Sequence, residues 1–261
     1  MIGRLTSAIR QLGAIDGVLY LAHRALGMLS SDRAGIFRYY LVAQPVPDAP
    51  PPAKAAARSA VSLIDAQDPL CASFPRPPHV IAKRFRDGNL CFASRSGERI
   101  SGFLWLANDA YEEDEVRCLY RLEQPEQSAW DYDVYVEPEY RLGRTFVRLW
   151  EAANRHLATE GVRWSFSRIS GFNPGSLQVH RKLGIRRLFS ATFVRVGPVQ
   201  ITFAGASPYI HVSLSARTRP TLRLSPPPDA RNAAPRAHDA ATPSRATGSR
   251  YTPNPLTNPR R

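Results

Sequence analysis

The sequence predicts an α+β domain in which a mixed, mostly antiparallel sheet is flanked by helices. Two observations favour this class. Several segments are rich in β-branched and aromatic residues or alternate apolar with polar residues, and hairpin signals such as residues 95–98 and Gly197-Pro198 join neighbouring segments. Between them, residues 145–160 carry apolar side chains at the spacing of one helical face. An apolar content of 43% is enough for a packed core.

The first 34 residues predict an amphipathic helical segment, separate from the domain that follows. Apolar residues recur at helical spacing from Ile2 to Leu29, and Arg4, Arg10 and Arg24 occupy the other side. Such a helix either touches an anionic membrane or a protein partner, or packs on the domain. The sequence leaves both interpretations open.

A domain is expected over residues 35–214. Its first strand is predicted at 35–46, and short helices are predicted at 55–63 and 77–86. Further strands are expected at 89–94, 99–107, 116–122, 187–196, 199–203 and 209–214. Residues 110–115 are acidic and favour a solvated loop, with contact to a cationic acceptor as the alternative.

The central stretch, residues 132–184, predicts a strand, a turn, a helix, a second strand and a short helix. Val134 and Val136 alternate with polar or amphipathic neighbours, and Pro138 ends that strand. The helical face that follows consists of Phe146, Leu149, Trp150, Ala153 and Leu157. Residues 162–169 predict the second strand, and residues 173–184 the last helix.

The turn in this stretch has the properties of an anion site. The first amides of a helix have no internal partners, and the helix dipole adds roughly half a positive charge there. Gly143 lets a ligand approach the backbone, and Arg141 and Arg144 add positive charge. The sequence therefore predicts an anion pocket between two strands.

Composition limits the remaining classes. Three cysteines without a C-x-x-C pair favour the cytoplasm and argue against a disulfide framework or a metal site. No stretch is long and apolar enough to span a membrane, and no cleavable signal is recognised. Of the net charge of +13, residues 215–261 carry +7, from nine Arg and two Asp. This segment has nine prolines, so we expect a disordered tail with no specific nucleic-acid binding.

Two motifs resemble the acyl-CoA-binding half of the GCN5-related N-acetyltransferases, the GNAT superfamily. The first is V-x-P-E-Y-R-x-G, which ends at Gly143, and the second is N-x-x-S-x-x-x-H-x-K-x-G over residues 173–184. Tyr140 and Thr145 depart from the family pattern at the turn, and His180 stands where the family has Tyr. The resemblance covers residues 90–203. It implies a central sheet of six to seven strands with splayed central strands.

The resemblance also implies where acetyl-CoA or another acyl-CoA would bind. The pyrophosphate would lie on the amides of Arg141, Leu142, Gly143, Arg144 and Thr145. The pantetheine arm would pair with the backbone at Val134 and Val136, near an N–H that would meet the developing oxyanion. Asn173 would hydrogen-bond this arm, and Ser176 would lie close to it. No metal is implied.

Two residues are candidates for proton transfer. By its place in the motif, His180 would protonate the leaving sulfur, and an imidazole suits this role near neutral pH. A structural histidine is the alternative. Among Asp131, Asp133 and Glu137, alternation along the strand favours Asp133 as the general base; a solvated or helix-capping acid, or a water chain in its place, is the alternative.

The sequence supports two functional hypotheses. In the first, the chain is an N-acyltransferase that transfers an acetyl or other acyl group to an amine on a small molecule or a protein. In the second, it is a non-catalytic domain of the same fold that binds a membrane surface or a protein partner through its N-terminal helix and basic tail. Aminoacyl transfer on a doubled version of the fold is disfavoured, because one copy fills the chain.

Overall fold

The computed structural model describes residues 9–31, 33–48 and 60–228. The chain divides after Pro227 into two units. The second unit lies outside the described residues except for Pro228. The helices are α2 (Ala14–Ser30), α3 (Pro78–Arg86), α4 (Thr145–Thr159) and α5 (Pro174–Lys182), with 3-10 helices η1 (Pro69–Ser73), η2 (Pro125–Gln127) and η3 (Pro138–Tyr140). None of the described helices combines the length and the apolar character needed to cross a bilayer.

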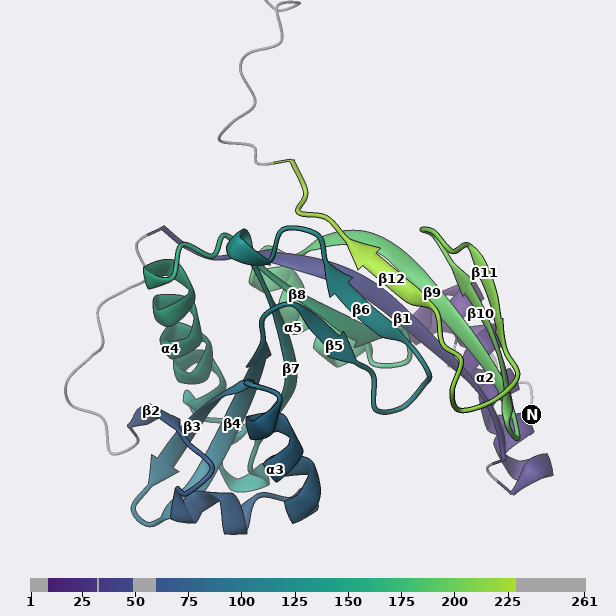
Figure 1. Cartoon of the computed structure of the whole chain (residues 1–261). Coiled ribbons are helices and arrows are strands. Elements are labelled where there is room, and N and C mark those ends of the chain that lie inside the picture. The colour runs from purple at the N-terminus through teal and green to yellow at the C-terminus, as the bar shows by residue number, and fades with distance from the viewer. Residues whose placement is uncertain (1–8, 32, 49–59, 229–261) are drawn as a thin grey trace, which may run out of the picture. The chain divides into compact units, whose positions relative to one another are not determined.

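The strands of the described ranges form two sheets (Figure 1). The main sheet has the order β11-β10-β9-β1-β8-β7-β4-β3-β2, and the small sheet has the order β12-β6-β5. The main-sheet strands are β1 (Ala34–Pro45), β2 (Val61–Ile64), β3 (Leu90–Ser96), β4 (Arg99–Ala107), β7 (Ser128–Val136), β8 (Trp164–Ser170), β9 (Arg186–Val196), β10 (Val199–Ala204) and β11 (Ile210–Ser213). The small-sheet strands are β5 (Ala110–Glu112), β6 (Leu119–Leu122) and β12 (Thr221–Leu224).

The α+β class is confirmed, and the main sheet is mostly antiparallel, with β7 and β8 as its parallel pair within the described ranges. Its nine described strands exceed the six to seven expected. One reason is that residues 61–64 form strand β2, although a helix was predicted at 55–63. Val61 and Leu63 pair with β3, so the sheet edge overrides the local helical preference. Residues 55–59 lie outside the described ranges.

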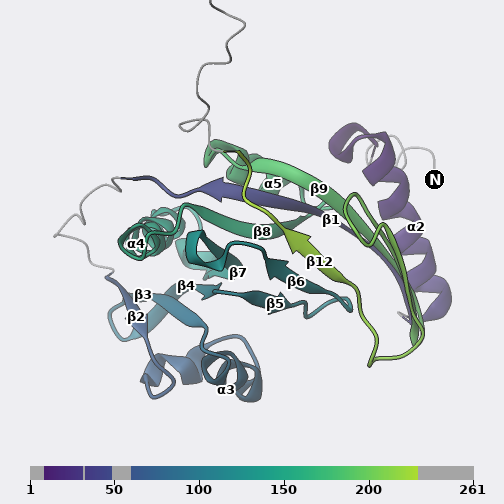
Figure 2. The same cartoon turned by 45° about the horizontal axis from the view of Figure 1, so that its top comes forward.

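The two faces of the main sheet pack against different layers. On one face, α4 covers β4 and β7, where Leu149, Trp150 and Ala153 pack on Leu104 and Leu106. This confirms the predicted apolar face of the helix. On the other face, the small sheet and α3 enclose a core rich in aromatic residues. Figure 2 shows α4 and the small sheet as separate layers around β7 and β8.

Helix α2 packs on β1 through polar residues. Asp16 accepts a hydrogen bond from the Tyr40 hydroxyl and pairs with Arg38 at 3.5 Å. His23 Nδ1 accepts a hydrogen bond from the backbone N–H of Ile36 at 3.2 Å. The interpretation of a helix packed on the domain is therefore confirmed for residues 14–30. The part of the predicted helical segment in residues 1–8 lies outside the described ranges.

The prediction that the tail is disordered from residue 215 is wrong for its first part. Residues 221–224 form β12, which pairs in parallel with β6. Leu222 and Leu224 are fully buried in the core. These two leucines give the segment enough apolar area to offset its chain entropy, although the Pro- and Arg-rich composition around them hides the signal. Residues 229–261 lie outside the described ranges.

The acidic segment 110–115 is a solvated loop only in part, at the exposed Asp114 and Glu115. Residues 110–112 form β5, and Tyr111 is buried against Tyr120, Trp130 and Tyr132. Glu113 is also buried, because Arg168 of β8 donates to both of its carboxylate oxygens at 2.9 and 2.7 Å. The acidic segment therefore supplies a carboxylate partner, Glu113, to Arg168 of the distant strand β8.

Candidate active site

Strands β7 and β8 pair over only three positions. Ser128, Ala129 and Trp130 lie opposite Trp164, Ser165 and Phe166. Beyond them, β7 continues beside β4 and β8 continues beside β1 (Figure 1). Within the described chain, the edge of β7 that faces β8 therefore has no strand partner after Trp130. This fork presents backbone N–H and C=O groups to which an extended ligand can hydrogen-bond.

Asp131 lies at the base of the fork. Its Oδ2 accepts a hydrogen bond from Ser165 Oγ at 2.7 Å, and both residues are buried. Burial raises the pKa of Asp131 to about 6, although the hydrogen bond from Ser165 and the nearby His180 act in the opposite direction. A carboxyl group that titrates this close to neutrality is a candidate proton acceptor.

A cavity of about 610 Å³ lies next to Asp131. Its aromatic wall consists of Tyr111, Trp130 and Tyr132, and the residues around α3 form the opposite wall. Its charged lining consists of the carboxylates Asp114, Glu115, Asp131 and Asp133 and the guanidinium groups Arg76, Arg84 and Arg168. A cavity of this size accommodates a small molecule.

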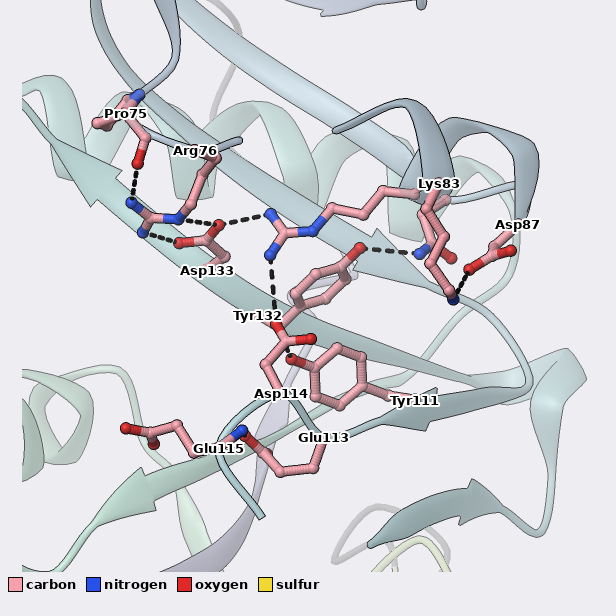
Figure 3. A network of polar contacts seen from close by, with 12 residues as sticks. Pro75, Arg76, Lys83, Asp87, Tyr111, Glu113, Asp114, Glu115, Tyr132 and Asp133 are labelled. Carbon is pink, nitrogen blue, oxygen red and sulfur yellow. Dashed lines mark hydrogen bonds and ion pairs between the residues drawn. The ribbon is translucent and has the colours of Figure 1, made fainter. Parts of the chain in front are cut away.

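Asp133 is held by two arginines (Figure 3). Arg76 Nε donates to Asp133 Oδ2 at 2.9 Å, and a second nitrogen of Arg76 donates to Oδ1. Arg84, which is almost completely buried, donates to the same Oδ2. Asp133 has a left-handed backbone with φ of 47°, at an irregularity in the pairing of β7 with β4. This bulge turns the carboxylate toward the arginines.

The other carboxylates give the cavity an acidic character. Arg168 pairs with Glu113 and with Glu115, the latter at 2.9 Å. Asp114 is mostly exposed and lies 3.4 Å from Arg84. The cavity is lined by four carboxyl groups and three guanidinium groups, an excess of one carboxyl group. The site therefore favours a cationic ligand.

The predicted anion turn lies beyond the carboxyl end of β7. Residues 141–144 are exposed, and no side chain caps the amino end of α4. The turn closes through Gly143 N–H, which donates to Tyr140 O at 3.0 Å. Arg141 Nε donates to Val136 O at 3.1 Å, so its guanidinium folds back over β7. The uncapped amides and the nearby arginines suit an anionic group.

Gly102 of β4 allows the amino end of α4 to approach the sheet. A Cβ at Gly102 would lie 2.6 Å from Tyr135 O and 3.1 Å from Thr145 Cγ2. No side chain fits in this space, so the first turn of α4 rests directly on the backbone of β4 and β7. Val134 and Val136 are partly buried and pack against the hydrophobic cluster that contains Leu149 of α4.

Helix α5 carries the remaining predicted residues. Asn173 caps it, because Asn173 Oδ1 accepts from Ser176 N–H at 3.0 Å. His180 Nδ1 lies 2.8 Å from Ser176 O, which assigns the ring proton to Nδ1 and leaves Nε2 free of that bond. The His180 ring meets the edges of Phe146 and Trp150 at 6.2 and 6.3 Å between ring centroids. The imidazole is therefore held between α4 and α5.

Most of the predicted site residues lie around the fork between β7 and β8. The side chain of Asp133, however, points to a different side of the sheet from Val134 and Val136. Val134 and Val136 pack toward α4, whereas the carboxylate of Asp133 lies among Arg76 and Arg84. Sequence reasoning did not single out the Asp131–Ser165 pair or the arginines of the cavity. An acid between two aromatic residues, Trp130 and Tyr132, was the available signal for Asp131.

No protein-family model matches the chain, and no curated protein is significantly similar to it. Solved structures do show similarity. A protein from Novosphingobium aromaticivorans assigned to the GNAT family of acetyltransferases is 16% identical, with a TM-score of 0.42. The match covers 60% of this chain and 62% of that chain. The similar structures include GNAT acetyltransferases.

Two further structures are named for the acceptor of the acetyl group. One is a GCN5-related glucosamine N-acetyltransferase region in a fungal multi-domain β-N-acetylglucosaminidase, at 18% identity and a TM-score of 0.43, covering 65% of this chain and 22% of that chain. The other is an aminoglycoside acetyltransferase from an uncultured soil metagenomic sample, at 14% identity and a TM-score of 0.35, covering 48% and 86%. At such values the similarity does not identify a reaction or an acceptor for this chain.

Proposed function

We propose that this chain is a GNAT-type N-acyltransferase that moves an acetyl or other acyl group from acyl-CoA to an amine on a small molecule. The observation that carries the proposal is the fork between β7 and β8, followed directly by the uncapped amino end of α4. An acyl-CoA needs both features. Its pantetheine arm is extended and hydrogen-bonds to backbone, and its pyrophosphate needs a positive, amide-rich site.

The chain has the groups needed to hold the co-substrate. The backbone of Val134 and Val136 would pair with the pantetheine arm, and the amides of residues 141–145 would bind the pyrophosphate. Gly102 supports this arrangement, because it fixes the first turn of α4 against the sheet. Asn173 and Ser176 on α5 would lie beside the arm. A backbone N–H near Val136 would stabilise the oxyanion, typically by roughly 3 kcal/mol.

In this proposal Asp131 is the general base. The amine nitrogen attacks the thioester carbonyl carbon, the carbon–sulfur bond breaks, and the amine proton passes to the Asp131 carboxylate directly or through water. Asp131 suits this role because its raised pKa of about 6 still leaves it mostly ionised at neutral pH. Asp133, the base expected from alternation, is less suited because Arg76 and Arg84 engage its oxygens.

His180 would return a proton to the departing thiolate. In this step His180 acts in its doubly protonated form: the Nδ1 proton stays hydrogen-bonded to Ser176 O, the Nε2 proton passes to sulfur, and Phe146 and Trp150 hold the ring in place. In the proposal Asp131 and His180 lie at the two ends of one proton path. The excess of carboxyl groups in the cavity supports an acceptor with at least one further cationic group. We place the reaction in the cytoplasm, where acyl-CoA is formed.

The proposal is tested by titrating the full chain with acetyl-CoA in a calorimeter and then measuring thiol release with a panel of amines. We expect binding of acetyl-CoA and faster thiol release with di- and polyamines than with monoamines. Arg144→Ala should weaken binding of acetyl-CoA more than that of dephosphorylated pantetheine thioester. An absence of binding at millimolar acetyl-CoA would leave the non-catalytic alternative as the better hypothesis.

A further inference from the structure

The edge of the main sheet formed by β10 and β11 has apolar side chains on the open face. Phe203 lies opposite Ile210, and Ile201 lies opposite Val212, so these four residues share one face. Phe203, Ile210 and Val212 are 45%, 64% and 50% exposed. A sheet with one solvated face normally presents polar residues there. This end of the sheet has the opposite pattern.

The buried alternate residues of β10 and β11 are polar, whereas those of β9, Ala191 and Phe193, belong to the apolar core. Gln200, Thr202 and Ser213 are completely buried against the small sheet and its connections. Gln200 explains why, since its side-chain amide accepts from Arg117 N–H at 2.9 Å and donates to Arg117 O at 2.8 Å. The polar face is thus fixed inward by specific hydrogen bonds, which leaves the apolar face outward.

Helix α2 shows the same inversion. Its polar residues Asp16 and His23 point to the domain and bond to β1. Ile15, Val18, Met28 and Leu29 are exposed, the last two by 79% and 86%. An amphipathic helix on a domain normally buries its apolar stripe and solvates its polar residues.

The exposed residues of α2 and of the sheet lie on the same face of the main sheet. Arg38 pairs with Asp16 of α2 and stands opposite Thr192 of β9, which in turn stands opposite Phe203 of β10. Figure 2 shows α2 and β12 on different sides of this part of the sheet. We group the exposed apolar residues of α2 and of this end of the sheet under the name α2–β11 surface: Ile15, Val18, Met28, Leu29, Val196, Phe203, Ile210 and Val212.

The charge around this surface is one-sided. Residues 186–214 contain no Asp or Glu, and the acids of residues 9–33 are Asp16, which is buried, and Asp32, which precedes Arg33 in the sequence. Arg24 lies on α2, Arg10 lies four residues before its start, and Arg33 accompanies the β9–β10 turn, where Gly197 N–H donates to Arg33 O at 2.8 Å. A second copy docked here would bring together three arginines of each copy, which outnumber the one acid, Asp32, that accompanies them in the sequence. An anionic lipid surface supplies the missing charge.

We propose that the α2–β11 surface docks on an anionic lipid bilayer. Its apolar side chains would enter the boundary between headgroups and acyl chains, typically about 5–10 Å deep, while the surrounding arginines contact phosphate groups. Such binding is peripheral and needs no membrane-spanning segment. Membrane binding would place the proposed acyl transfer at a lipid surface. The binding itself does not depend on that reaction.

The test is co-sedimentation of the full chain with vesicles of phosphatidylcholine alone and with 30% phosphatidylglycerol. We expect binding to the second kind, at least tenfold stronger than to the first and weakened by salt. Leu29→Ser, and separately the double variant Ile210→Thr and Val212→Thr, should each weaken binding by about tenfold or more. Leu63→Ser is the matched control, because Leu63 is also exposed but lies on β2 at the opposite edge of the sheet.

Three results would overturn the proposal. The native chain could stay in the supernatant with both vesicles. Leu29→Ser and the double variant could both bind as the native chain does, which would assign vesicle binding to other arginines. The native chain could form a dimer in light scattering that Leu29→Ser dissociates, in which case the surface would bind a second copy. All the substituted side chains are exposed, and the two-vesicle comparison uses the native chain, so none of these results depends on a variant that fails to fold.

Discussion

Ser165 Oγ donates a hydrogen bond of 2.7 Å to the carboxylate of Asp131 at the point where β7 and β8 stop pairing. The bond stabilises the charged form of a buried acid, and burial opposes it. The balance leaves the pKa of Asp131 at about 6. The ionised Asp131 therefore lowers the stability of the fold but is a good proton acceptor. We expect two substitutions to test these properties separately.

Asp131→Asn should abolish turnover and stabilise the fold above pH 6. Because the folded-state pKa is raised from 3.8 to about 6, the folded chain binds a proton that the unfolded chain has released within this window. Native stability therefore falls as pH rises from about 4 to about 6 and is then constant. The loss is up to about 3 kcal/mol, at about 1.4 kcal/mol per unit.

The measurement is thermal unfolding of both proteins between pH 4 and 8, beside thiol release. The melting temperatures should agree near pH 4 and differ by several degrees at pH 8, with the variant higher. A variant that unfolds more easily than the native chain at pH 8 would show that the charged Asp131 contributes to stability.

Ser165→Ala should raise the pKa of Asp131 further and move the acid limb of the pH–rate profile to higher pH. A hydrogen bond to a charged group is worth roughly 1.5–3 kcal/mol, and Ser167 compensates in part, so we expect a shift of about one unit. Ser128→Ala is the matched control. Ser128 is a buried serine of β7 whose hydroxyl has no hydrogen-bond partner among the described residues. Profiles of kcat/KM that coincide for all three proteins would exclude Asp131 as the base.

Asp133→Asn should destabilise the fold while leaving a folded enzyme active. The substitution keeps a side chain that tolerates the left-handed backbone but removes the charge between Arg76 and Arg84. Leaving the buried Arg84 with only its 3.4 Å pair to the exposed Asp114 should cost about 2–4 kcal/mol, which chemical denaturation measures. Asp87→Asn, in an exposed pair with Lys83, should cost less than about 1 kcal/mol. Complete loss of turnover in a folded Asp133→Asn variant would restore Asp133 as the base.

The bulge at Asp133 explains which parts of the site the sequence could predict. The strand, turn and helix around residues 134–159 follow from local periodicity, and they are present as expected. The direction of the Asp133 side chain depends on a shift in pairing with β4 and on arginines about 50 residues away. The apolar–polar alternation of β7 encodes neither the shift in pairing nor the arginines. Residues 131 and 133 fall on the same face of a regular strand, so the alternation cannot distinguish Asp131 from Asp133.

Long-range pairs explain the other differences. The acidic segment becomes β5 and a buried carboxylate because Arg168 reaches Glu113 from β8. Residues 61–64 become a strand because β3 offers them an edge. In both cases the local composition is compatible with several structures, and the partner that decides between them is distant in the chain.

His180→Phe should lower kcat by about 10- to 100-fold with a smaller change in KM for acetyl-CoA. The ring of Phe retains the contacts with Phe146 and Trp150 but removes the proton donor. His156→Phe is the control, since His156 lies on α4 and contacts Phe92 at 5.6 Å between ring centroids. Steady-state kinetics across pH 6–9 provide the comparison. Equal kcat values for His180→Phe and the native chain at every pH would assign His180 a structural role.

Leu222→Ala should destabilise the domain although Leu222 lies in a Pro- and Arg-rich segment. Leu222 is fully buried beside Tyr120 and Leu224 in the core under the small sheet, so its truncation leaves a cavity that typically costs about 2–4 kcal/mol. Leu214→Ala is the matched control, because Leu214 is 69% exposed and should change stability by less than about 0.5 kcal/mol. A chain that ends after Pro228 should unfold like the full chain, whereas one that ends after Ser215 should unfold more easily, because it lacks β12. Denaturation midpoints that agree for both truncations would mean that β12 does not contribute to the fold.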